Sequence, residues 1–100
     1  MTRVSLYVEL KAKSGKEAEV AAFLASARSL VNAEPATVTW FAVRFDPATF
    51  AIFDAFNDEA GREAHLAGQV AAALMARAGE LLATPPQIRK AEVLADKLPA

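Results

Sequence analysis

The sequence predicts a single α+β domain, a four-stranded antiparallel sheet with its helices on one face. Its 100 residues suffice for one domain with a modest core. Segments with the period of strands and of helices follow one another in the order strand, helix, strand, strand, helix, strand. The hairpin at residues 38–56 is apolar on both of its faces. The order is that of the ferredoxin-like split βαβ arrangement, and no repeat or linker divides residues 1–100.

The first strand and the first helix have clear sequence patterns. Residues 3–11 alternate between apolar and polar side chains, with Tyr7 on the polar side. Ser14-Gly15-Lys16-Glu17 matches a capping box, which predicts the start of a helix. Apolar residues with helical spacing continue from there to Val31, and Pro35 helps to end the helix.

The hairpin is expected to turn at Asp46-Pro47-Ala48-Thr49, where Pro47 has the fixed φ of the second turn position. Residue 45 would then pair with 50, and 41 with 54. The first face would hold Phe41, Val43, Phe45, Phe50, Ile52, Asp54 and Phe56. The second face would hold Val38, Trp40, Ala42, Arg44, Ala51, Phe53 and Ala55. This register separates Arg44 from Asp54.

Right-handed connections place both helices on the same side of the sheet, which leaves the other face uncovered. A chain of this length cannot cover both apolar faces with its own helices. A second copy of the sheet is the expected cover, so the sequence predicts a homodimer through the sheet faces.

The last part of the chain completes the fold. Asn57 or Asp58 should cap a short helix over residues 59–67, which Gly68 interrupts. A further helical segment extends to Thr84, and a last strand covers residues 88–94. The charged residues Glu59, Arg62 and Glu63 are expected to form a solvated helix face.

Composition excludes several classes of function. The net charge of −1 and the pI near 5.8 argue against a nucleic-acid surface, including that of an RNA-recognition domain, and against an anionic membrane. There is no cysteine, and one histidine without clustered carboxylates makes a metal site unexpected. No secretion signal or bilayer-spanning run is present at the sequence level, so we expect a cytoplasmic protein.

Three stretches, residues 34–41, 53–59 and 62–66, resemble the antibiotic biosynthesis monooxygenase family in order and spacing. The resemblance implies a dimeric α/β barrel. It also implies a cofactor-independent monooxygenase that uses dioxygen on a small aromatic, phenolic or quinol-type substrate. Haem-degrading members use an asparagine in strand one, a tryptophan and a histidine. Here strand one lacks asparagine, and His65 and Met75 fall at or beside the other two positions, so the resemblance argues against haem breakdown.

The resemblance and the residue chemistry together give the candidate site. His65, the only histidine, is the candidate base, since imidazole can accept a proton near neutral pH. A helix-terminal structural role for His65 is the alternative. The candidate substrate-binding residues are Trp40, Phe53, Tyr7, Phe23, Leu66 and Met75.

Other roles remain open for these residues and for the chain. Trp40 could simply pack, Tyr7 could hydrogen-bond at a dimer interface, and Phe23 and Met75 could belong to the core. The second functional hypothesis is a non-catalytic, small-molecule-binding or stress-associated dimer on the same scaffold. The third is an isomerase-like or decomposing enzyme.

Overall fold

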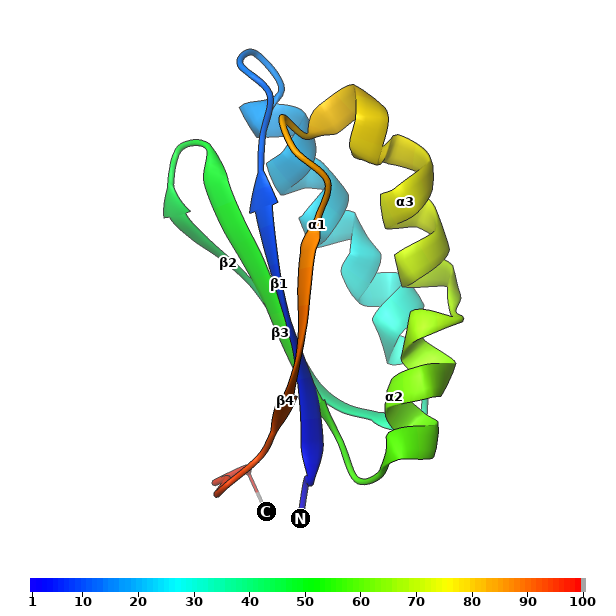
Figure 1. Ribbon diagram of the computed structural model, residues 1–100. Helices are drawn as coiled ribbons and strands as arrows, with labels where there is room; N and C mark the ends of the chain where they lie inside the picture. Colours follow the sequence, from blue (N-terminus) through cyan, green and yellow to red (C-terminus); the bar gives the residue numbers. More distant parts are fainter. Residues whose placement is uncertain (100) are drawn as a thin grey trace.

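The computed structural model describes residues 1–99 (Figure 1). Its single sheet is antiparallel, with the strand order β2-β3-β1-β4. In chain order the elements are β1 (Val4–Lys11), α1 (Glu17–Asn32), β2 (Thr37–Asp46), β3 (Thr49–Phe56), α2 (Glu59–Leu66), α3 (Gln69–Leu81) and β4 (Gln87–Glu92).

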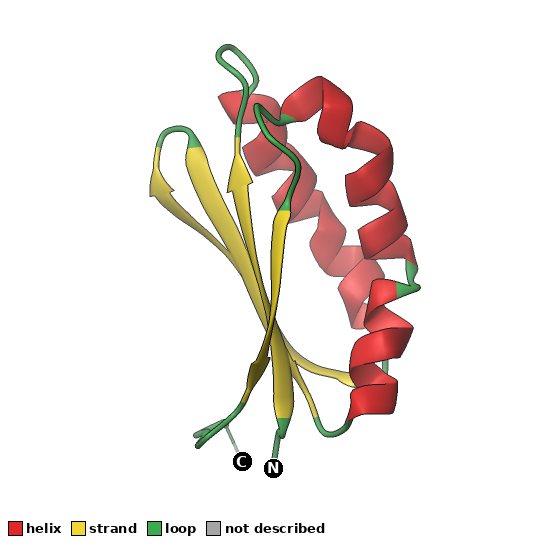
Figure 2. Ribbon diagram, viewed as in Figure 1, coloured by secondary structure: helices red, strands yellow, loops and turns green. Residues whose placement is uncertain are grey.

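The helices lie on one face of the sheet, and the described residues leave the opposite face uncovered (Figures 1 and 2). The predicted ferredoxin-like α+β fold is confirmed. Thr2 and Asp96 lie together, and the Asp96 carboxylate accepts hydrogen bonds from the backbone N–H and the hydroxyl of Thr2, at 2.8 and 2.6 Å. Over residues 1–99, no helix has the length and apolar character needed to span a bilayer.

The predicted signal for the start of α2 is confirmed, whereas the one for the start of α1 is wrong. Asp58 Oδ1 accepts from the Gly61 N–H at 2.8 Å, which caps α2, and Gly68 separates α2 from α3. The capping box predicted for α1 does not form: Lys16 is the N-cap residue, Ser14 makes no cap, and Glu17 accepts from the Gly15 N–H at 2.8 Å rather than from that of Ser14. Gly15 has a φ of +87°, a left-handed conformation that favours glycine.

The core lies between the helices and the inner face of the sheet. Residues from β1, α1, β3 and α3 supply it, because each of these elements presents its apolar positions to the same layer. Its main buried members are Val8, Leu10, Val20, Phe23, Leu24, Phe50, Ile52, Leu74, Leu81 and Leu82.

The hairpin register differs from the prediction by one residue. The turn is as expected, with Asp46 opposite Thr49, but an irregularity between Arg44 and Asp46 shifts the rest of β2. Phe41 therefore pairs with Phe53 rather than with residue 54, and Arg44 rather than Phe45 pairs with Phe50. An extra residue in one strand moves every later side chain to the other face, and the hairpin sequence does not reveal this bulge.

The shift changes which side chains share a face. Trp40 and Arg44 lie on the helix side with Asp54, and the Arg44 guanidinium stacks 4.8 Å above the Phe50 ring. The prediction that Arg44 and Asp54 lie on opposite faces is therefore wrong. The predicted grouping of Trp40 with Phe53 is also wrong.

The outer face of the sheet keeps its apolar character despite the new register. Its large apolar side chains are substantially exposed: Phe41 at 55%, Val43 at 43% and Phe53 at 40%. Tyr7 lies directly opposite Phe53 on this face. We call the set of Tyr7, Phe41, Val43 and Phe53 the outer apolar patch.

Arg62 corrects the prediction of a solvated face on α2. It is buried, and its Nη1 donates to the carbonyl oxygens of Ser5, at 3.2 Å, and Ala91, at 3.3 Å. Its Nη2 pairs with Glu59, whereas Glu63 stays exposed. The charge pattern did not predict the burial of Arg62, because a long side chain on a polar helix face can still reach inward to strand carbonyls.

Candidate active site

His65 lies at the centre of a buried polar cluster. Its Nδ1 is 2.6 Å from Oε1 of Glu34, and its Nε2 is 3.0 Å from Oδ2 of Asp54. The Thr37 hydroxyl donates to the same Glu34 oxygen at 2.8 Å. The side chain of His65 is 7% exposed and that of Asp54 only 1%. We call Glu34, His65 and Asp54 the charged cluster.

Three separate elements bring the charged cluster together. Asp54 projects to the helix side of β3, the same side as the buried Phe56. The Asp58 cap sets the start of α2, and His65 near its end lies over the sheet, 5.5 Å from the Phe56 ring centroid. Glu34 follows α1 in a turn in which its carbonyl accepts from the Thr37 N–H at 3.2 Å.

The charged cluster stabilises the protonated imidazole. Burial by itself lowers the pKa of His65, but the close contacts of the Asp54 and Glu34 carboxylates with the ring nitrogens, and their negative charges, outweigh it and raise this pKa above its usual value. Neither Asp54 oxygen accepts a well-aligned hydrogen bond from a described residue, so its contact with Nε2 is chiefly ionic. With His65 protonated, the charged cluster carries one net negative charge.

This arrangement restricts the chemistry of the imidazole. Both ring nitrogens face carboxylates, so neither is directed at open space. The carboxylates also lie on opposite ring nitrogens, which prevents all three groups from binding one ion. Among residues 1–99, no group of three or more histidine, cysteine, aspartate or glutamate residues could hold a metal.

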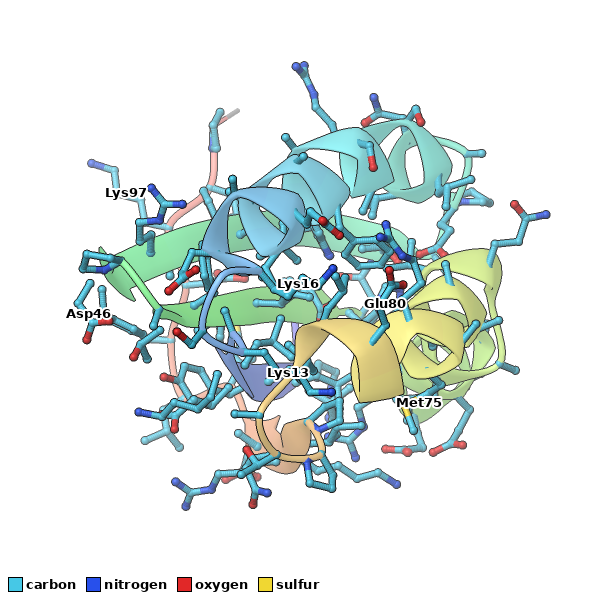
Figure 3. The ribbon with its side chains drawn as sticks, turned by 90° about the horizontal axis from the view of Figure 1, so that it is seen from above. Lys13, Lys16, Asp46, Met75, Glu80 and Lys97 are labelled. Carbon is cyan, nitrogen blue, oxygen red and sulfur yellow. The ribbon has the colours of Figure 1, made fainter. Side chains whose placement is uncertain are left out.

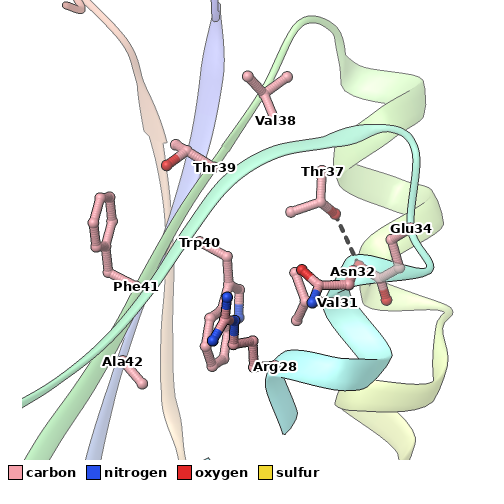
Figure 4. Close-up of a pocket in the computed structure, with 10 residues that line it drawn as sticks. All are labelled: Arg28, Val31, Asn32, Glu34, Thr37, Val38, Thr39, Trp40, Phe41 and Ala42. Carbon is pink, nitrogen blue, oxygen red and sulfur yellow. Dashed lines mark hydrogen bonds between the residues drawn. The ribbon is translucent and has the colours of Figure 1, made fainter. Parts of the chain in front are cut away.

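A cavity of about 400 Å³ lies beside the charged cluster, between the C-terminal half of α1 and β2 (Figure 4). We call it the Trp40 cavity. In Figure 4 the Trp40 side chain points toward α1, while Phe41 and Thr39 point to the other side of β2. Its walls are mixed in chemistry and include Arg28, Asn32, Glu34, Thr37, Trp40 and Phe41. The Trp40 indole N–H is buried and has no hydrogen-bond partner among the described residues.

A second cavity of about 240 Å³ borders the other side of the charged cluster. Its walls are small and apolar except for His65, Glu34 and Thr37. Glu34 thus contributes to both cavities, whereas His65 lines only the second. The residues that line both cavities are Glu34 and Thr37.

The structure brings together two of the seven predicted site residues. Trp40 pairs across the hairpin with Asp54, which contacts His65. Phe53 and Tyr7 lie on the outer face, away from the Trp40 cavity.

The remaining three predicted residues lie on the helices. Phe23 is a core residue, in line with its packing alternative, and Leu66 is half-buried at the end of α2. Met75 is 58% exposed at the periphery of α3, so the expectation that it is core is wrong (Figure 3). None of the three lines the Trp40 cavity.

Glu34 is the residue that sequence reasoning missed. It opens the stretch 34–41, so the family resemblance included it, but nothing in its immediate sequence separates a buried carboxylate from a solvated one. Asp54 stands out in the sequence as a charge within an apolar strand. Its partner remained hidden, because α2 and β3 meet only in the folded chain.

Comparison with solved structures places the chain in a family. No family model and no curated protein matches it. The crystal structure of NE2512, a protein of unknown function from Nitrosomonas europaea, is 62% identical with a TM-score of 0.98, over 100% of this chain and 97% of that one. The chain belongs to the family of NE2512. The TM-score shows that the two chains share their fold throughout.

More distant structures relate the NE2512 family to a known fold. One is described as a "Putative antibiotic biosynthesis monooxygenase from Nitrosomonas europaea", at 15% identity and a TM-score of 0.82, covering 92% of this chain and 99% of that one. A second so described, from Caulobacter crescentus, is 18% identical with a TM-score of 0.80 and covers 94% and 92%. The predicted resemblance to the antibiotic biosynthesis monooxygenase family is thus confirmed at the level of the fold.

Proposed function

We propose that this protein is a cofactor-independent monooxygenase that binds a small aromatic, phenolic or quinol-type compound in the Trp40 cavity. The observation that carries the proposal is the Trp40 cavity itself: an aromatic wall lies next to a buried, proton-holding cluster. Planar phenols need both features, a flat apolar surface for the ring and a polar group for the hydroxyl. A cytoplasmic location stays a prediction.

The chemistry required of the protein is modest. A base removes a proton from the bound phenol or activated methylene, and the resulting electron-rich anion reacts with dioxygen. For an anthrone-type substrate, the methylene carbon loses two hydrogens and keeps one oxygen atom as a carbonyl, and the second oxygen leaves as water. The substrate supplies the electrons. His65 is the proposed base, and it acts in its neutral form, which becomes the major one only above its raised pKa. A positioned base contributes about 10²–10⁴-fold to a rate.

A homodimer through the outer apolar patch is part of the same proposal. Phe41, Val43 and Phe53 expose about half of their surface on a sheet face that no described helix covers. Burying such side chains contributes about 1.5–3 kcal/mol each, and a second copy offers a patch of the same chemistry. Tyr7 and Phe53, predicted as substrate-binding, would then lie in the dimer interface.

Oxygen uptake tests the proposed reaction. We expect the purified, colourless protein to consume dioxygen with a hydroquinone or an anthrone, and His65→Ala to lower the rate by about 10²-fold or more. Glu63→Gln is the matched control, because it removes an exposed carboxylate of α2 whose ion pair, among residues 1–99, is with Lys90 of β4. If neither substrate is turned over, or if His65→Ala is as active as Glu63→Gln, the proposal is wrong.

One observation favours the second candidate, a non-catalytic binding dimer. Both nitrogens of His65 are occupied by carboxylates, an arrangement that also suits a purely structural ion pair. This alternative predicts that phenols bind in the Trp40 cavity without any oxygen uptake. Calorimetric binding measured beside the oxygen electrode separates the two candidates.

A further inference from the structure

We propose that the Trp40 cavity binds its aromatic ligand as an anion, with the negatively charged oxygen of the ligand against Arg28. The inference rests on the proposed function, since it assumes an aromatic ligand in this cavity. It adds the charge of that ligand and its orientation, which the aromatic wall by itself does not define.

Arg28 is a cation without a counter-charge. It is the only basic residue that lines the Trp40 cavity, and it takes part in no ion pair among residues 1–99. No carboxylate of α1 lies three or four residues from it, the spacings at which helical side chains pair. Its neighbours at these spacings are Leu24, Ala25, Val31 and Asn32. The other two arginines in helices, Arg62 and Arg77, each pair with a carboxylate.

The end of α1 does not explain the position of Arg28 either. The favourable interaction of a cation with the helix dipole is confined to the last turn, and the last turn of α1 contains no basic residue. Arg28 lies one turn earlier, on the same helix face as Asn32, and both residues are exposed. Figure 4 shows both on the α1 side of the cavity, toward which the Trp40 side chain points. The guanidinium is therefore available to a ligand.

The wall around Arg28 is rich in hydrogen-bond donors. The guanidinium has five N–H donors and no acceptor, the Asn32 amide adds two donors, and the Trp40 indole N–H has no partner among the described residues. The first two groups can meet a ligand directly, whereas the indole nitrogen is covered and gains a partner only if the side chains around it shift. A carboxylate or phenolate oxygen supplies the acceptor and the negative charge that this wall lacks.

The charges along the cavity wall orient the ligand. Glu34, the only carboxylate of the lining, lies beyond the end of α1 and does not pair with Arg28. It belongs to the charged cluster, which carries one net negative charge when His65 is protonated. An anionic oxygen is repelled by this cluster and attracted by the guanidinium, so it should bind at Arg28 with the ring against Trp40.

The fluorescence of Trp40 reports binding in this cavity, because it is the only tryptophan of the chain. The probes are benzoate and benzamide, which share the ring and nearly the same shape but differ in charge. We expect both to change the Trp40 emission of the wild-type protein. Benzoate should bind about tenfold or more tightly than benzamide, because hydrogen bonds to charged groups are stronger than those between neutral groups. Added salt should weaken the binding of benzoate and leave that of benzamide nearly unchanged.

Substitutions of Arg28 test its role. Arg28→Met should lower the affinity for benzoate about tenfold or more and leave the affinity for benzamide unchanged. Arg28→Lys keeps the charge but loses the bidentate geometry, so it should retain part of the preference. Arg77→Met is the matched control, because it removes the same charge from α3, outside the lining of the cavity, and should match wild type. Calorimetry measures each affinity independently of the Trp40 emission.

The dye 4-nitrophenol distinguishes a phenolate from a carboxylate as the bound anion, because only its phenolate is yellow. If a phenolate binds at Arg28, the apparent pKa of the bound dye is lowered in wild type, and Arg28→Met raises it again by about one unit, which corresponds to a tenfold change in the ratio of the two forms. A preference for benzoate without this shift assigns a carboxylate to the ligand.

The outcomes separate the charge of the ligand from the proposed reaction. If benzoate and benzamide bind equally and the dye shows no shift, or if Arg28→Met binds as Arg77→Met does, an anionic ligand at Arg28 is wrong although the cavity binds aromatic compounds. If the preference depends on Arg28 but no phenol is oxidised, the anionic ligand stands and the monooxygenase proposal falls. If none of the three probes binds, both fall.

Discussion

His65 and Asp54 depend on one another at the scale of single residues. Asp54 is 1% exposed and has no well-aligned hydrogen bond from a described residue, so the imidazolium is its main source of charge compensation. Glu34 has more options, because Thr37 donates to it and its side chain is partly exposed. Loss of the imidazole should therefore destabilise the fold mainly by leaving the Asp54 carboxylate without a counter-charge.

We expect His65→Gln to lower the free energy of unfolding by about 3–5 kcal/mol at neutral pH, the cost of leaving one member of a buried ion pair without its partner. The double variant His65→Gln/Asp54→Asn should recover much of this loss, since it removes the orphaned charge as well. Urea denaturation of both variants measures the difference. A single variant that unfolds within about 1 kcal/mol of wild type would contradict the ionic role.

The pH dependence of stability provides a second test at this scale. The pKa of His65 is raised in the folded protein relative to about 6.5 in the unfolded chain, so the folded state binds the proton more tightly. This contribution to stability is fully present below pH ~6.5 and is lost as the pH rises through the folded pKa.

Thermal unfolding across neutral and mildly alkaline pH measures this effect. We expect the melting temperature of wild type to decline over that range and the melting temperature of His65→Gln to be nearly flat. The carboxylates whose pKa is lowered, those of Asp46, Glu59 and Asp96, titrate at lower pH and do not confuse the result. A stability that rises with pH there would refute the assigned protonation state.

The helices and strands could be predicted from local sequence signals, whereas the contacts between them could not. The Asp58 cap and the break at Gly68 could be predicted, because capping and chain interruption involve neighbouring residues. The bulge in β2 could not, since an extra residue in a strand leaves no local mark when apolar residues fill both faces. The inward reach of Arg62 was missed for a similar reason: its acceptors belong to β1 and β4.

Arg62 joins α2 to two strands, and its removal should loosen that end of the fold. Arg62→Met keeps most of the apolar stem but deletes the donors to the Ser5 and Ala91 carbonyls. We expect a loss of about 1–3 kcal/mol in the free energy of unfolding, the usual cost of buried polar groups left without partners. Lys16→Met, which breaks an exposed pair with Glu19, is the control and should cost less than about 1 kcal/mol. Equal effects in the two variants would show that Arg62 behaves as a surface charge.

For the whole molecule, the sequence predicted the fold class and the two-sided apolar hairpin, but of the candidate site only His65 and Trp40. The fold class follows from element order, which survives errors of a residue or two. The site depends on which side chains face each other across elements, and a one-residue shift in β2 moved Trp40 away from Phe53 and toward Asp54. Physically, periodicity reports that a face is apolar, while register decides which residues belong to it.

The outer apolar patch leads to the prediction that concerns the whole molecule. Phe53 lies in the middle of the patch, with Tyr7 opposite it in β1 and Phe41 opposite it in β2. A charge there would have to be desolvated in a dimer, at a cost far above the contribution of the lost aromatic contact, but would be solvated in a monomer. Phe53→Asp should therefore convert the proposed dimer to a monomer, as measured by analytical ultracentrifugation at micromolar concentration. A loss of ~3 kcal/mol of association energy would weaken the dimerisation constant at least ~10²-fold.

Met75→Asp is the matched control for this variant. Met75 is also apolar and is 58% exposed, but it lies on α3, on the helical side of the sheet, so the Met75→Asp protein should remain dimeric. A wild-type protein that sediments as a monomer, or a Phe53→Asp variant that remains dimeric, would show that this sheet face is not the interface.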